Sequence, residues 1–243
     1  MELDSPRKVI ITIDGPAGSG KSTLARSLAH ELGLAYLDTG ATYRALAIKA
    51  IREGIDFDDE ELTSELAHRV NISFKPARSA GLRTKVFLDA QDITDRLSYN
   101  EVSMAASSIS RHPRVREAMV GLQRRMADAE IREEQSEHPN ALIGVVVEGR
   151  DTGTVVFPNA TVKIYLIASL EMRARRRLPD FAGKNMTLED IMAAIEARDQ
   201  SDADRSVGPL KQAADAIILD STNNTQEQTL EQAIEIVKAK IGR

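Results

Sequence analysis

A glycine-rich segment near the start of the chain has the residue types that hold phosphate groups. Residues 15–22 read GPAGSGKS and fit the pattern G-x-x-x-x-G-K-S between an apolar stretch and an amphipathic one. Glycines let the backbone wrap around phosphate oxygens, Lys21 reaches the β- and γ-phosphates, and the Ser22 hydroxyl is a ligand of Mg²⁺. We therefore predict a nucleoside triphosphate site with Mg²⁺. Its expected residues are Gly15, Pro16, Ala17, Gly18, Ser19, Gly20, Lys21, Ser22 and Thr23.

A second site must decide what kind of phosphate chemistry follows. A phosphate loop alone does not distinguish a GTPase, a mechanical ATPase and a small-molecule kinase, although the sequence has no N-K-x-D segment for guanine. Residues 36–46, YLDTGATYRAL, place a carboxylate and a hydroxyl at the end of a predicted strand, where open α/β sheets bind ligands. Arg44, on the helix expected next, presents a planar guanidinium suited to a second phosphate.

Three ionisable residues follow another predicted strand. In VVVEGRDTGTVVFP, residues 145–158, Glu148, Arg150 and Asp151 surround a glycine directly after an apolar run. Such a group is either a structural ion cluster or a ligand site. We favour the site, because the segment ends at the same edge of the predicted sheet.

A third set of charges occupies one face of a predicted helix. Arg198, Asp202 and Arg205 are spaced i, i+4 and i+7, so their side chains share that face. Taken alone, this spacing fits a binding face and a solvated ladder of salt bridges equally well.

The elements that must position these residues alternate between strands and helices. Residues 8–15, 34–38, 144–149, 161–168 and 215–221 are apolar and rich in β-branched side chains, and residues 20–33 are amphipathic. Apolar strands of this kind predict an α/β fold with a doubly wound, five-stranded parallel sheet. Residues 70–96 are typical of a small antiparallel unit, and the arginine-rich segment 171–190 predicts a helical appendage.

The amino-acid composition excludes several classes of protein and of functional site. The chain has 243 residues, no cysteine, four histidines and a formal net charge of −5. Disulfides, thiolate catalysis and cysteine zinc sites are therefore excluded, and there is no general attraction to nucleic acid. The apolar runs are too short to span a membrane, and residues 1–7 are too short and polar for a signal peptide. We expect a cytoplasmic, monomeric protein.

Taken in order, these segments resemble the bacterial cytidylate kinases, also called CMP or (d)CMP kinases. The resemblance is carried by IDGPAGSGKST, YLDTGATYRA, EGRDTGTVVFP, RARRR, RDQSDADR and AADAIILDST, and it covers nearly the whole chain from residue 8. It implies one P-loop kinase unit over 8–243, divided as follows. The core would comprise 8–69, 104–171 and 188–243, the insert that binds the nucleoside monophosphate 70–103, the lid 172–187, and a disordered tail 1–7.

The resemblance also implies an activity, which is ATP-dependent phosphorylation of CMP and dCMP to CDP and dCDP by in-line transfer. The implied catalytic residues are Lys21, Arg150 and Arg205. For CMP it implies Arg44, Arg150 and Arg205 at the phosphate, Arg198 and Asp202 at the ribose, Ser107, Arg116 and Asp151 at cytosine, and Thr39 and Tyr43 lining the pocket. The implied lid arginines are Arg173, Arg176 and Arg177. Thr39 stands where some family members have serine, which keeps the hydroxyl.

Two other classes stay open from the residues. One is a P-loop kinase for a different small acceptor, which a panel of acceptors would separate. The other is a nucleic-acid-binding ATPase that grips phosphates with the arginine clusters. The acidic overall balance argues against the second class.

Overall fold

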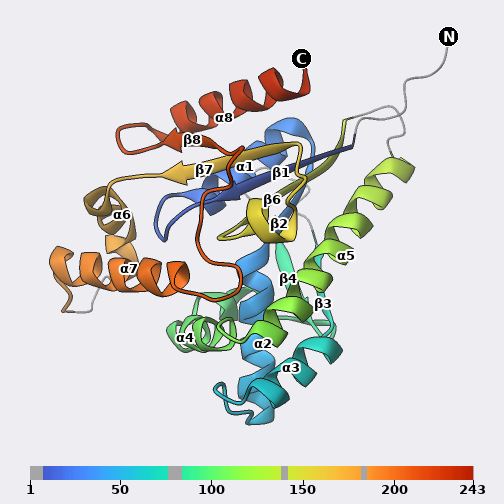
Figure 1. Ribbon diagram of the computed structural model, residues 1–243, viewed down its shortest axis with the longest axis vertical. Coiled ribbons are helices and arrows are strands. Elements are labelled where there is room, and N and C mark those ends of the chain that lie inside the picture. Colours follow the sequence, from blue (N-terminus) through green and yellow to red (C-terminus); the bar gives the residue numbers. More distant parts are fainter. Residues whose placement is uncertain (1–7, 76–83, 138–141, 182–184, 243) are drawn as a thin grey trace.

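A five-stranded parallel sheet runs through the centre of the molecule (Figure 1). The structure is a computed structural model and describes residues 8–75, 84–137, 142–181 and 185–242. In spatial order the strands are β2 (Ala35–Asp38), β6 (Ile143–Gly149), β1 (Lys8–Asp14), β7 (Val162–Ile167) and β8 (Ile217–Asp220). All neighbouring strands pair in parallel, which confirms the sheet predicted from the apolar segments.

Helices cover both faces of this sheet, which explains why its inner strands are apolar at successive positions. Val146 packs in a cluster with α1 (Lys21–Leu32) and α8 (Gln226–Ile241), whereas its neighbours Val145 and Val147 pack with α5 (Pro113–Glu137). Because successive side chains of a strand point to opposite faces, the two clusters lie on opposite sides of the sheet. The predicted doubly wound arrangement is therefore confirmed.

A second core lies at one end of the molecule, where Figure 1 shows α2, α3 and α4 gathered with β3 and β4. The helices are α2 (Thr39–Glu53), α3 (Glu60–Arg69) and α4 (Asn100–Ile109). The predicted antiparallel unit is present as β3 (Ile72–Lys75), β4 (Lys85–Leu88) and β5 (Gln91–Asp92). Its apolar face packs against all three helices and the first half of α5. The insert boundaries at 70 and 103 stay a prediction.

A helical unit covers the glycine-rich loop. It consists of α6 (Leu170–Arg177), a 3₁₀ turn (Leu178–Phe181) and α7 (Leu188–Ala203). Ile191 and Ile195 of α7 pack with Ala174 of α6 and with Ala17 of the loop. Within the predicted lid, residues 182–184 lie outside the described residues, as do the predicted tail 1–7 and residues 138–141. Among the described residues, no helix has both the length and the apolar character that crossing a membrane requires.

β7 lies between β1 and β8, so a substitution at Ile164 tests the packing of the sheet core. Ile164 is 1% exposed and lies level with Ile13 and Ile217 on the neighbouring strands. We expect Ile164→Ala to lower the free energy of unfolding by about 2–5 kcal/mol, because it leaves a cavity. The matched variant Ile164→Val should lower it by only about 0.5–1.5 kcal/mol. Urea unfolding measures both, and equal losses would show that the site is loosely packed.

Candidate active site

The glycine-rich loop connects the end of β1 to the start of α1, as predicted. Gly15 has φ of 148°, and a Cβ there would lie 2.1 Å from the carbonyl oxygen of Leu166, so the turn requires glycine. Lys21 is buried, and its Nζ donates to the carbonyl oxygen of Pro16 at 2.7 Å. Burial, reinforced by Arg150, lowers the pKa of Lys21. An anionic phosphate beside the ammonium group would oppose that effect, as the loop's chemistry predicts.

A buried carboxylate lies beside the predicted metal ligand. Glu148 accepts a hydrogen bond from Ser22 Oγ at 2.8 Å and another from the hydroxyl of Tyr36. Burial, followed by the nearby Asp38, raises the pKa of Glu148. Oxygen ligands of this kind suit Mg²⁺, which usually takes one or two protein oxygens and keeps water and phosphate for the rest. Glu148 was noted in the sequence without a role, and the structure places it beside Ser22, the expected Mg²⁺ ligand.

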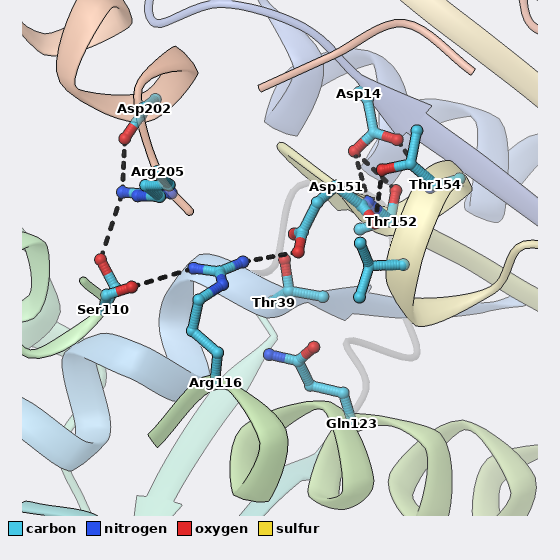
Figure 2. Close-up of polar contacts among 12 residues, drawn as sticks. Asp14, Thr39, Ser110, Arg116, Gln123, Asp151, Thr152, Thr154, Asp202 and Arg205 are labelled. Atoms are coloured by element: carbon cyan, nitrogen blue, oxygen red, sulfur yellow. Dashed lines mark hydrogen bonds and ion pairs between the residues drawn. The ribbon is translucent and has the colours of Figure 1, made fainter. Parts of the chain in front are cut away.

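A chain of polar contacts joins α7, α4, α5 and the residues after β6 (Figure 2). It runs from Asp202 through Arg205 and Ser110 to Arg116 and Asp151. Arg116 Nη2 donates to Asp151 Oδ2 at 2.5 Å, and its Nη1 donates to the carbonyl oxygen of Ser110 at 3.1 Å. Arg205 Nη2 lies 2.5 Å from Asp202 Oδ1 and 3.2 Å from Ser110 Oγ. The structure thus brings together four residues that the sequence assigned to one pocket.

The charges of this network are largely buried, which bears on how the α7 spacing is interpreted. The side chains of Arg116 and Asp151 are 3% and 7% exposed, and that of Asp202 is 4% exposed. The side chain of Arg205 is 9% exposed as well, so this face of α7 is not a solvated ladder of salt bridges, and its role in binding stays a prediction. Asp202 also accepts from Arg150 Nε at 2.8 Å. Although burial alone would raise the pKa of Asp202, Arg150 and Arg205 lower it below its usual range.

Several arginines gather next to this network. Burial, reinforced by Arg150, lowers the pKa of Arg198 to about 10, and Arg177 and Arg44 act in the same direction. Arg44 Nη2 donates to Asp38 Oδ2 at 2.7 Å and is partly exposed. Mutual repulsion among guanidinium groups is what an anion would relieve. The expected phosphate and ribose residues therefore share one positive region.

The remaining expected pocket residues lie around the same network. Thr39 Oγ1 donates to the carbonyl oxygen of Glu148 at 2.7 Å. Arg116 lies 5.5 Å above the centre of the Tyr43 ring, and burial raises the pKa of Tyr43 to about 12. Ser107 contacts the network through its carbonyl oxygen, which accepts a hydrogen bond from Ser110 Oγ at 3.0 Å. The structure therefore puts Ser110 in direct contact with both arginines, and the role of Ser107 at cytosine stays a prediction.

Two of the three expected lid arginines donate hydrogen bonds to the glycine-rich loop. Arg173 donates to the carbonyl oxygen of Ala17 at 3.0 Å, and Arg176 donates to that of Ser19 at 3.1 Å. Arg177 lies 5.5 Å above the centre of the Phe181 ring, and its Cδ would be 3.4 Å from a Cβ built at Gly18 of the loop. Asp199, which the sequence analysis missed, pairs with Arg173 and accepts from Ala17 N at 2.8 Å. Its position directly after Arg198, on a helix already singled out, was the available signal.

Similarity to known proteins covers nearly the whole chain. The profile of the family described as Cytidylate kinase matches residues 11–239. The chain belongs to the cytidylate kinase family. It is 44% identical to a cytidylate kinase from Pelotomaculum thermopropionicum, over 94% of this chain and 96% of that one. It is 39% identical to one from Vibrio vulnificus, over 98% and 99% of the two chains. A cytidylate kinase family member is a nucleoside monophosphate kinase, which favours that class over a nucleic-acid-dependent ATPase.

The crowded arginines predict stabilisation by a small multivalent anion. We expect inorganic phosphate, about a hundredfold above its Kd, to stabilise the fold by about 2.7 kcal/mol. That gain corresponds to a rise in Tm of roughly 5–10 °C. Differential scanning fluorimetry measures it, with sodium chloride at equal ionic strength as the control. The rise should shrink in Arg198→Gln, and an equal rise with chloride would contradict specific binding among the arginines.

Proposed function

We propose that the chain transfers the γ-phosphoryl group of ATP to CMP and dCMP, with Mg²⁺, as a cytoplasmic monomer. The observation that carries the proposal is the buried pair of Arg116 and Asp151, next to several arginines and the phosphate loop. A buried pair of opposite charges is costly unless additional hydrogen bonds satisfy it. In this pocket, the amino group and ring acceptors of a cytosine base are the partners that match it.

The donor side would be held by the glycine-rich loop and Lys21. Lys21 exchanges its contact with Pro16 for the β- and γ-phosphate oxygens of ATP. Ser22 would hold Mg²⁺, with Glu148 at its hydroxyl, and the ion would neutralise charge that spreads over the phosphates. Backbone N–H groups at the start of α1 supply further donors.

The acceptor side would be held by the arginines. Arg44, Arg150 and Arg205 bind the phosphate of CMP, and one of its oxygens attacks the γ-phosphorus in line with the departing oxygen of ADP. The bond between the γ-phosphorus and the β-bridging oxygen breaks as the new bond forms, and CDP and ADP result. The attacking phosphate is already ionised, so the step requires no general base. Positioning and charge neutralisation supply the catalysis.

The base would be read by the Arg116 and Asp151 pair. Asp151 accepts a hydrogen bond from the 4-amino group of cytosine, and Arg116 donates to N3 or O2. Uracil presents an acceptor at position 4 and an N–H at position 3, so it meets the wrong partner at both places. A wrong base leaves buried polar groups unpaired, which supports strong discrimination.

Replacing Arg116 tests this assignment. We expect Arg116→Met to lower kcat/KM for CMP by roughly a hundredfold or more, the scale of a lost charge-assisted hydrogen bond plus an unpaired carboxylate. The loss for UMP should be clearly smaller. Steady-state assays with both acceptors measure this, and circular dichroism checks the fold of the variant. Equal losses for CMP and UMP would assign Arg116 to phosphate binding or packing.

The function itself is tested by one assay across acceptors. Coupled ADP release with ATP and Mg²⁺ is measured for CMP, dCMP, UMP, AMP and GMP. We expect CMP and dCMP to have the highest kcat/KM. A preference for a different monophosphate, or for none of them, would overturn the proposal and favour a P-loop kinase with another acceptor.

A further inference from the structure

Asp14 is a buried carboxylate to which the proposed mechanism gives no role. It is the last residue of β1, directly before the glycine-rich loop, and it is 5% exposed. Its Oδ1 accepts from the backbone N and the Oγ1 of Thr152, both at 2.8 Å, and its Oδ2 accepts from Gly153 N at 2.7 Å. Figure 2 shows Asp14 above Thr152, on the side of the network that ends at Asp151. Both carboxylate oxygens are thus directed at one short segment.

That segment is a single π-helical turn, Thr152–Val156, which follows Asp151 immediately. Turns of this kind are rare and frequently occur at functional sites. The first N–H groups of any helical turn have no partner within it, and here Asp14 accepts two of them. Thr152 is fully buried, so water does not replace these bonds. Asp14 therefore supplies the hydrogen bonds that hold the start of the turn in place.

The position of this π-helical turn determines where Asp151 lies. Asp151 is the residue before the turn, and its carbonyl oxygen accepts from Val155 N at 2.8 Å and from Val156 N at 3.2 Å. Its side chain then pairs with Arg116. A shift of the turn would move the carboxylate that faces the base, and a misplacement of about 1 Å can cost a hundredfold in rate.

We propose that Asp14 is a positioning residue for recognition of the acceptor base. By anchoring the π-helical turn, Asp14 holds the Asp151 carboxylate in the position that faces the base. This proposal rests on the proposed function of Asp151. The competing role, contact with Mg²⁺ at the donor site, would use a lone pair that accepts no hydrogen bond within the protein. Three of the roughly four acceptor positions on this carboxylate already accept from Thr152 and Gly153, which favours the positioning role.

The test is Asp14→Asn, which keeps the size of the side chain but turns an N–H₂ group toward one of the N–H donors. We expect kcat/KM for CMP to fall by about tenfold to a hundredfold. The ratio of kcat/KM for CMP to that for UMP should fall by a similar factor, and KM for ATP should stay within about threefold of the unmodified enzyme. A purely structural role would lower activity with both acceptors equally.

Thr152 provides a matched pair in case Asp14→Asn does not fold. Thr152→Val keeps the shape and removes only the Oγ1 bond to Asp14, so we expect a loss on the order of tenfold for CMP and a smaller loss for UMP. Thr152→Ser keeps the hydroxyl and should restore most of the selectivity. Equal activity of the valine and serine variants would overturn the proposal.

The other possible results of these assays show whether the role of Asp14 fails or whether the proposed function itself fails. Equal losses for CMP and UMP, or a rise in KM for ATP larger than the change for CMP, would overturn the positioning role. If the unmodified enzyme prefers another monophosphate, the proposed function fails. The variants are then compared with that acceptor against UMP, and an unchanged selectivity ratio in Asp14→Asn would still overturn the role of Asp14.

Discussion

The candidate site depends on the ion pairs that the buried carboxylate of Asp202 makes. It pairs with Arg150, the residue after β6, and with Arg205, just beyond α7. Removing a charge from water costs several kcal/mol, and the carboxylate between these two guanidinium groups offsets part of that cost for both. Through Arg205 and Ser110 the same contact reaches α4 and Arg116. One acidic side chain thus joins the helical unit over the loop to the second core.

The register of the parallel sheet explains why the other site residues meet. Asp14 is level with Gly149, and Asp38 is level with Glu148. Carboxyl ends of β1, β2 and β6 therefore open at one edge, with the glycine-rich loop at the same place. From this edge Glu148 reaches Ser22. The register, rather than the local sequence, brings donor and acceptor residues within reach of each other.

Much of this arrangement could be predicted from local patterns. Strands and the loop between β1 and α1 were recognisable because continuous apolar runs and glycine spacing are properties of short segments. The burial of Asp202 could not be predicted in this way. Helical spacing shows which side chains share a face of a helix, but it does not show what packs against that face. Ser110 and Asp14 were missed for the same reason, as their partners lie in distant elements. The resemblance to a family supplied candidate residues, whereas their contacts required the fold.

The strand order has a consequence for how the chain is made. β6 lies between β2 and β1, so the first two strands of the sequence share no hydrogen bonds with each other. During synthesis, β1 therefore has no partner strand in this sheet until residue 143 and those after it have left the ribosome. Until then its apolar side chains are not covered by that strand. Long-range pairing of this kind slows folding and leaves apolar segments open to aggregation on the ribosome. A chain that stops before β6 carries the whole phosphate loop and lacks the strand between β1 and β2 that completes its support.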